Sequence, residues 1–88
     1  MKASRPAPVA ARVTHVREQF SQLTGQELVS VSSVAKVDDG WQFTVEVVEL
    51  HRIPDTASLL ASYRVTTDDE GDVTGYERIR RYHRGEAG

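Results

Sequence analysis

Basic and aromatic residues alternate near the end of the chain, a pattern that can bind nucleic acid, protein or the chain's own acidic strands. Five residues spaced two apart would share one side of a strand: Tyr76, Arg78, Arg80, Tyr82 and Arg84. Such a stripe can stack bases and neutralise phosphates. It can equally pair with acidic residues of a neighbouring strand or bind a protein partner. The residues alone leave these three interpretations open, with cross-strand pairing the simplest.

An acidic partner for this stripe is available in the middle of the chain. Glu46 falls on the polar side of a predicted strand, where it could pair with the arginines across a sheet. Glu49 lies three residues further on, and residues an odd number apart on a strand project to opposite faces. Glu46 and Glu49 are therefore not expected to form a close acid–base pair.

Residue types that bind metals or catalyse reactions are present, but not in spacings typical of either. The three histidines, His15, His51 and His83, are scattered along the chain, without the short spacing of a zinc site. The acidic run at residues 68–72 lacks the ligand spacing of a calcium loop and is predicted to be a solvated turn. No nucleophile motif or phosphate-binding loop occurs either. We therefore expect no catalytic residues, no metal, no cofactor and no enzyme activity.

The segment RIPDT, residues 52–56, follows directly after a predicted strand. Pro54 cannot donate a ladder hydrogen bond and so ends the strand, and Asp55 favours a turn. The simplest interpretation is a stiff strand exit, but an exposed Ile53 in a rigid turn could also anchor another chain. The predicted partner-binding residues are Glu46, Arg52, Ile53, Pro54, Asp55, Arg78, Arg80 and Tyr82.

Length and composition limit the scaffold that can position these residues. A chain of 88 residues without cysteine predicts one small domain that folds without disulfides. No apolar run approaches the ~20 residues that span a bilayer, and the first residues do not resemble a secretory signal. The net charge of -2 argues against bulk attraction to nucleic acid. The charge is uneven, however, because residues 38–72 hold nine acidic and two basic side chains between two basic ends.

The first element predicted is a helix over residues 8–24. Apolar residues recur at spacings of four, three, four and three, which places them on one core-facing stripe: Val9, Val13, Val16, Phe20 and Leu23. Gly25 then stands where a left-handed cap ends a helix.

Beyond Gly25 the apolar period changes to two, which predicts strands. The first strand covers residues 28–37, with four residues on one side: Val29, Val31, Ala35 and Val37. Asp38, Asp39 and Gly40 predict a hairpin in which glycine supplies a positive φ. The second strand should direct four residues toward the helix: Trp41, Phe43, Val45 and Val47.

Two further strands complete the predicted fold. One carries alternating apolar residues from Leu59 to Val65, and the other covers residues 73–84, with a bulge or twist near Gly75. The fold class is therefore α+β, with one N-terminal helix packed on a four-stranded antiparallel meander in two layers. We expect a flexible leader at residues 1–7, a single domain at 8–85 and a flexible tail at 86–88.

Several of these segments together resemble the gas vesicle synthesis protein O family. The resemblance covers roughly residues 13–85 and rests on TG, DDGW, VEVVEL, RIPDT and YERIRRYHRG, in this order. It implies a cytoplasmic accessory factor, either free or associated with gas vesicles, that acts by protein–protein interaction. The implied partners are the shell proteins or other accessory proteins, including the ring ATPase, with no nucleic acid and no membrane span. The motif carries no catalytic residues.

Two other classes of protein remain open on the residues alone. A helix laid across an antiparallel sheet is shared by cystatin-like and PepSY-like peptide-binding or inhibitory modules. A single-stranded nucleic-acid binder would use the basic and aromatic stripe.

Overall fold

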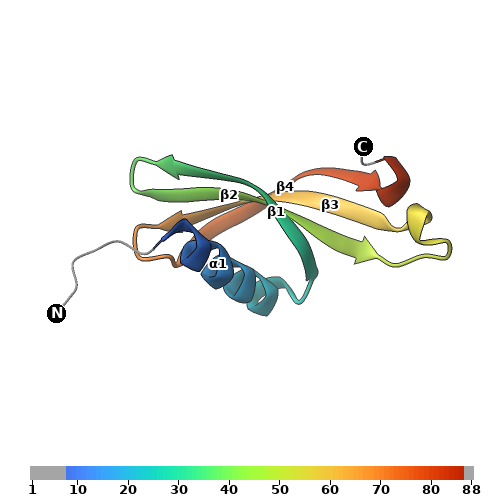
Figure 1. Cartoon of the computed structure of the whole chain (residues 1–88), viewed down its shortest axis with the longest axis horizontal. Helices are drawn as coiled ribbons and strands as arrows, with labels where there is room; N and C mark the ends of the chain where they lie inside the picture. Colours follow the sequence, from blue (N-terminus) through green and yellow to red (C-terminus); the bar gives the residue numbers. More distant parts are fainter. Residues whose placement is uncertain (1–7, 87–88) are drawn as a thin grey trace.

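The computed structural model describes residues 8–86 and confirms the α+β meander. The elements follow the chain as α1 (Val9–Thr24), β1 (Glu27–Val37), β2 (Gly40–Leu50), the 3-10 turn η1 (Asp55–Ala57), β3 (Leu59–Asp68), β4 (Val73–His83) and the 3-10 turn η2 (Arg84–Glu86). The strands pair in chain order as one antiparallel sheet, which α1 crosses on one face (Figure 1). The predicted leader at 1–7 and residues 87–88 of the predicted tail lie outside the described residues. Glu86, also assigned to that tail, is the last residue of η2.

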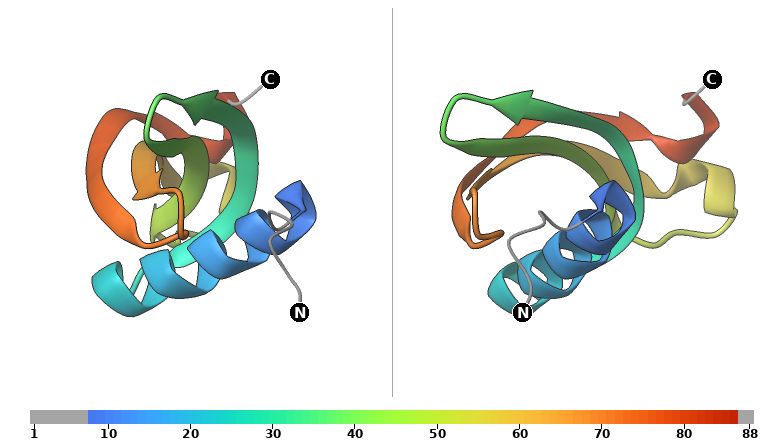
Figure 2. Two further views of the ribbon diagram at one scale, coloured as in Figure 1. Left: turned by 90° about the vertical axis from the view of Figure 1, so that its left-hand side faces the viewer. Right: turned by 60° about the vertical axis from the view of Figure 1, so that its left-hand side comes forward.

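The helix ends as predicted but buries less of its stripe. Gly25 has φ 71° and donates its N–H to the carbonyl of Ser21 at 2.8 Å, so the left-handed cap is confirmed. Val16 and Phe20 are fully buried, whereas Val9 and Leu23 are 48% and 55% exposed. Placing the whole stripe in the core was therefore wrong at both ends. The straight helix crosses a curved sheet, so only its middle turns meet the sheet (Figure 2).

The hydrophobic core lies between the helix and the two central strands. Its buried members are Val16, Phe20, Phe43, Val45, Val47, Ala61 and Val65. The ring of Phe20 packs 5.5 Å from Tyr63 and 5.6 Å from Tyr76, in tilted and edge-on arrangements typical of aromatic clusters. Three of the four helix-facing residues predicted on β2 are fully buried, and Trp41 packs against them.

The face predicted for β1 is wrong in part. The register of β1 against β2 shifts at two bulges, between Leu28 and Ser30 and between Val31 and Ser33. Each bulge adds one residue that has no direct partner, so the inward side moves from a spacing of two to a spacing of three. The residues that pack on the core are Leu28, Val31 and Val34, whereas Val29 is 39% exposed.

The hairpin between β1 and β2 forms where it was predicted, but not for the predicted reason. Val37 pairs with Gly40 across the turn, yet positive φ angles occur in residues 8–86 only at Gly25 and Gly71. A Cβ atom on Gly40 would lie 1.8 Å from the carbonyl oxygen of Thr67 in β3. Glycine is required here because two backbones approach each other closely.

Within residues 8–86, no helix has both the length and the hydropathy needed to cross a bilayer.

Candidate functional site

The basic and aromatic stripe predicted on β4 is divided between the two faces of the sheet. The register of β4 against β3 shifts between Arg78 and Arg80, which leaves Ile79 as a bulge without a direct partner. Arg78 therefore pairs with Tyr63 on the helix side, whereas Arg80 pairs with Ser62 on the opposite side. The prediction of one continuous stripe was wrong because alternation restarts at the bulge. A second shift, around Thr74, confirms the irregularity predicted near Gly75.

On the face away from the helix, Glu46 is the centre of a hydrogen-bonded cluster. Its carboxylate accepts hydrogen bonds from the hydroxyls of Tyr82 at 2.7 Å, Ser32 at 2.8 Å and Ser62. The guanidinium of Arg80 lies 4.4 Å from the centre of the Tyr82 ring. The cluster thus joins β1, β2, β3 and β4 through one carboxylate.

Burial and hydrogen bonding oppose each other in this cluster. Burial raises the pKa of Glu46, but hydrogen bonds from Ser62, Tyr82 and Ser32 outweigh it, so the pKa is held below its usual value. For Tyr82, burial and the hydrogen bond to Glu46 both raise the pKa of the phenol. The carboxylate therefore stays charged and the phenol stays a donor at neutral pH.

On the helix side, Glu49 forms a second cluster. Its carboxylate accepts from Arg81 at 2.8 Å, from Tyr63 at 3.2 Å and from Arg78 at 3.4 Å, and its side chain is 11% exposed. Burial raises the pKa of Glu49, but these hydrogen bonds and the charge of Arg81 outweigh burial, so the pKa lies below its usual value. Glu46 and Glu49 occupy opposite faces, as predicted. The ion pairs to β4 are made by Glu49, which the sequence analysis did not expect.

The RIPDT segment forms an exposed loop at the end of the sheet where the two clusters lie. We call residues 52–55 the tip loop; they are Arg52, Ile53, Pro54 and Asp55. The side chain of Ile53 is 100% exposed, and that of Leu50, at the end of β2, is 46% exposed. Beneath the loop, the hydroxyl of fully buried Ser58 accepts the backbone N–H of Arg52 at 3.0 Å. The loop is therefore exposed on its outer side and hydrogen-bonded on its inner side.

The eight predicted site residues all lie in the half of the sheet that ends at η1 and η2, but they do not form one surface. Glu46, Arg80 and Tyr82 lie on the face away from the helix, Arg78 lies on the other face, and the tip loop closes the end. Ser58 was not predicted, because its position after DTA gives no signal for burial. The Arg81 bond to Glu49 was not predicted either, because a bulge cannot be located from alternation alone.

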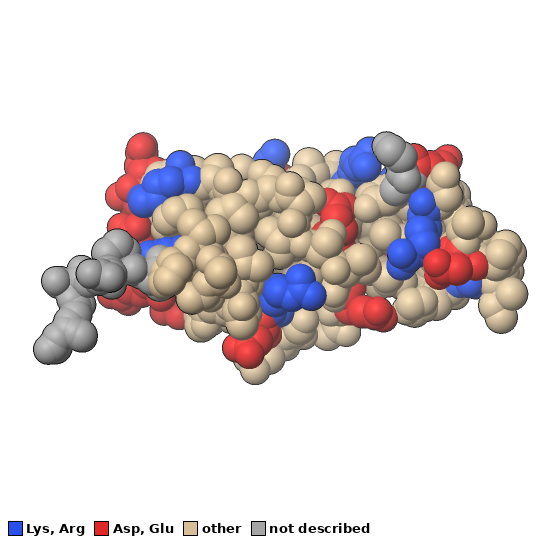
Figure 3. Space-filling view, viewed as in Figure 1, with Lys and Arg blue, Asp and Glu red and all other residues tan. Residues whose placement is uncertain are grey.

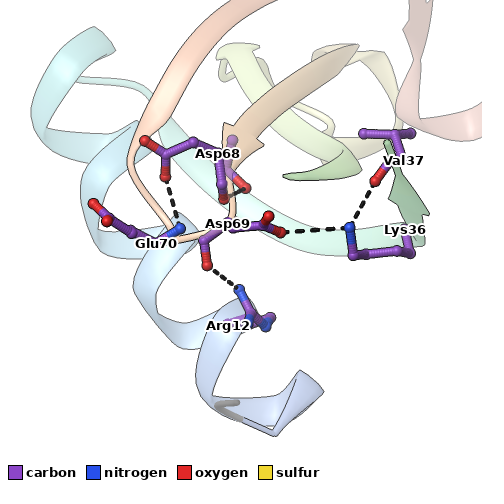
Figure 4. A network of polar contacts seen from close by, with 7 residues as sticks. Arg12, Lys36, Val37, Asp68, Asp69 and Glu70 are labelled. Carbon is purple, nitrogen blue, oxygen red and sulfur yellow. Dashed lines mark hydrogen bonds and ion pairs between the residues drawn. The ribbon is translucent and has the colours of Figure 1, made fainter. Parts of the chain in front are cut away.

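The opposite end of the molecule carries the acidic turns. Acidic side chains gather there with basic ones beside them, and at the η1–η2 end arginines and carboxylates also lie side by side (Figure 3). Asp69 ties the turn to the helix and to β1, because its carbonyl accepts from Arg12 at 3.3 Å and its carboxylate lies 3.4 Å from Lys36 (Figure 4). These contacts hold the β3–β4 turn against α1.

Three carboxylates in this turn lie close enough together to suggest a cation site, but one of them is already used by the backbone. Ligand oxygens of Asp68, Glu70 and Asp72 lie within 4.8 Å of one another. Asp68 accepts the backbone N–H groups of Glu70 at 2.9 Å and Asp72 at 3.0 Å. The carboxylate of Asp68 therefore stabilises the turn itself.

Comparisons with known proteins give one consistent family. The family model described as "Gas vesicle synthesis protein GvpO" matches residues 1–88. Gas vesicle protein O of Streptomyces sp. (strain CB03234) is 57% identical over 67 residues, which are 76% of this chain and 52% of that protein. Gas vesicle protein O1 of Halobacterium salinarum is 40% identical over 73 residues, which are 83% of this chain and 61% of that protein.

A third relative, Gas vesicle protein O of Haloferax mediterranei, is 38% identical over 71 residues, which are 80% of this chain and 51% of that protein. The chain thus spans about half to three fifths of the length of these relatives. No solved structure matches the chain.

Proposed function

The chain belongs to the gas vesicle synthesis protein GvpO family, and we propose that it serves gas vesicle synthesis as a non-catalytic assembly factor in the cytoplasm. In this proposal it binds another gas vesicle protein, a shell protein or an accessory protein, through the end of the sheet that carries the tip loop. The observation that carries the proposal is Ile53, a fully exposed aliphatic side chain on a loop fixed by internal hydrogen bonds.

An exposed aliphatic residue on an ordered loop is suited to anchoring a partner. Burial of an isoleucine side chain contributes about 1.5–3 kcal/mol, and a few well-buried side chains supply most of the binding energy in many interfaces. The loop is ordered before binding, because Ala57 donates to the carbonyl of Pro54 and Ser58 to that of Asp55, both at 2.9 Å. A preorganised loop loses little conformational entropy when a partner binds.

The charges around the tip loop indicate the chemistry of the partner. The carboxylates near this end already have partners: Glu27 is hydrogen-bonded to His51 at 2.9 Å, Asp55 pairs with Arg84 at 3.1 Å and Glu49 pairs with Arg81. In the described part of the chain, no carboxylate lies within ion-pair distance of Arg52. The tip loop therefore presents one aliphatic group beside one free cation, which fits a partner surface that offers an apolar contact bordered by a carboxylate.

An assembly role agrees with the physical needs of a protein shell. Subunits that bury a large apolar surface in a finished wall must be kept from aggregating before they join it. A small domain with a stiff binding loop can hold such a subunit, or a protein that handles it, without changing it chemically.

Direct binding tests this proposal. The other gas vesicle proteins of the same organism are produced separately, and each is titrated against the wild-type chain, Ile53→Asp and the control Leu23→Asp. Leu23 is also an exposed aliphatic residue, at 55%, but it lies on α1. We expect one protein to bind the wild type and the control alike, and to lose at least tenfold in affinity for Ile53→Asp. Equal affinity for both variants, or no binding to the wild type, would contradict the proposal.

A further inference from the structure

We propose that Ser58 and Arg84 are positioning residues, which hold the tip loop in its binding conformation without contacting the partner. This inference rests on the proposed function of Ile53. It assigns to the segment after β4 the task of holding the tip loop in place. Neither the family membership nor the exposure of the loop accounts for this task. We call the contacts among Asp55, Ser58 and Arg84 the loop clamp.

Ser58 fixes the loop from beneath. Its hydroxyl accepts the backbone N–H of Arg52 at 3.0 Å and donates to the carboxylate of Asp55 at 3.3 Å. One side chain therefore bonds to both ends of the tip loop. Ser58 is 0% exposed, so a partner that binds the outside of the loop cannot reach this hydroxyl.

Arg84 fixes the same loop from the C-terminal side. Its backbone N–H donates to the carbonyl of Ser58 at 2.8 Å. Its Nε lies 3.1 Å from the carboxylate of Asp55, within ion-pair distance but without the alignment of a hydrogen bond. The side chain is 34% exposed, whereas that of Asp55 is 67% exposed. Arg84, the first residue of η2, thus links the segment after β4 to Asp55, which lies 29 residues earlier in the chain.

Close packing of η2 on η1 completes the clamp. A Cβ atom on Gly85 would lie 3.1 Å from the carbonyl oxygen of Thr56 and 3.3 Å from its side chain. Glycine at this position lets the two turns approach each other, and η1 and η2 lie side by side in Figure 1 and in the right-hand view of Figure 2. The contact holds η1, which begins at the last residue of the tip loop, against η2.

The clamp explains why an exposed loop can be stiff. The side chain of Ile53 is fully exposed, so it contributes no burial energy that could fix the loop. The conformation of the loop must therefore be fixed by other contacts. The two hydrogen bonds of Ser58 and the ion pair of Arg84 supply them from the inner side. Without them the loop would have to be ordered at the moment of binding, which lowers affinity.

Hydrogen exchange tests the clamp without any partner. The variants are Arg84→Ala, Asp55→Asn, both together, and Arg84→Lys, which keeps the charge. The control is Arg64→Ala, which removes another exposed ion pair of the sheet, to Glu77 at 3.7 Å. We expect Arg84→Ala to speed exchange of the amides of residues 52, 57 and 58 about two- to fivefold, the range for loss of an exposed ion pair, with β2 and β3 unchanged.

The double variant distinguishes a shared clamp from separate effects. If Arg84 acts through Asp55, the double variant exchanges no faster than Arg84→Ala alone. Arg84→Lys, which keeps the charge, should exchange more slowly than Arg84→Ala. Unchanged exchange in Arg84→Ala, or the same effect in Arg64→Ala, would overturn the clamp.

Vesicle formation then tests whether the clamp positions a binding loop. In a strain lacking this protein, Arg84→Ala should give fewer vesicles than the wild type, and Arg84→Lys should recover part of the loss. Normal vesicle number despite fast exchange would overturn the positioning role, while the binding proposal would stand or fall with Ile53→Asp alone.

Discussion

Arg81 of β4 donates its Nε–H to Glu49 of β2 at 2.8 Å, across the intervening strand β3. The next residue, Tyr82, donates to Glu46 of β2 at 2.7 Å on the opposite face. Consecutive residues of one strand therefore hold two carboxylates of another strand that is not its neighbour. This arrangement stabilises the part of the sheet that carries the tip loop, where VEVVEL, RIPDT and YERIRRYHRG meet.

These carboxylates predict a loss of stability in acid. Folding lowers the pKa of Glu46 and of Glu49 below the value of about 4.3 typical of glutamate in unfolded chains. Each contributes stability that is present above that value and is lost as the pH falls through the lower, folded pKa. Glu49→Gln should therefore lower the free energy of unfolding by about 1–3 kcal/mol at pH 7, because charged hydrogen bonds are lost.

Urea denaturation of wild type and Glu49→Gln at pH 7 and at pH 3 measures this effect. The difference between the two proteins should shrink at pH 3, because this pH lies below the pKa of glutamate in unfolded chains and the unfolded wild type then gains a proton. A difference of equal size at both pH values would show that the charge of Glu49 does not stabilise the fold.

The core depends on the middle of the helix more than on its ends. Phe20 is 0% exposed and packs on Tyr63 and Tyr76, so Phe20→Ala should cost about 3–5 kcal/mol. Leu23→Ala, on the same predicted stripe but 55% exposed, should cost less than about 1 kcal/mol. Thermal melts of the two variants check the prediction, and similar losses for both would contradict the packing of α1.

Two glycines should respond differently to alanine. At Gly40 the added Cβ would meet the Thr67 carbonyl at 1.8 Å, so backbone must move and the cost should be about 1–3 kcal/mol or more. At Gly75 nothing lies within 4 Å of the added atom. Gly75→Ala should therefore leave the melting temperature nearly unchanged, and equal shifts for the two variants would refute the close approach at Gly40.

Much of the architecture could be predicted from local pattern. The helix, its cap at Gly25 and the order of four strands all follow from spacing and turn residues that act within a few positions. The hairpin at residues 38–39 was placed correctly, but Gly40 is required by the backbone of Thr67 in β3 and not by a positive φ. The helix-facing side of β2 was also predictable, because that strand is central and Phe43, Val45 and Val47 alternate without interruption.

The errors in strand alternation fall on the two edge strands, where bulges interrupt it. Four residues have no direct partner on the neighbouring strand: Val29, Ser32, Thr74 and Ile79. Nothing in their side chains marks them, since a bulge depends on the twist of the whole sheet and on what the partner strand presents. The continuous stripe on β4 was mispredicted for this reason: one extra residue at Ile79 places Arg78 and Arg80 on opposite faces.

The divided stripe also predicts weak contact with nucleic acid. Arg78 pairs with Glu49, and Tyr82 is bonded to Glu46, so neither is free to stack or to neutralise phosphate. A fluorescently labelled single-stranded oligonucleotide should show no submicromolar binding at physiological salt. Tight binding whose affinity falls steeply with salt concentration, with a slope that corresponds to the release of several ions, would favour the nucleic-acid alternative instead.

Vesicle production by Ile53→Asp tests the central claim most directly. A strain lacking this protein is complemented with the wild type, Ile53→Asp or Leu23→Asp, and folding of each variant is confirmed by circular dichroism. Vesicles are then counted by microscopy and by buoyancy. The proposal predicts few or no vesicles with Ile53→Asp and normal numbers with Leu23→Asp. Normal numbers with a folded Ile53→Asp variant would show that the tip loop is not the surface through which this protein serves gas vesicle synthesis.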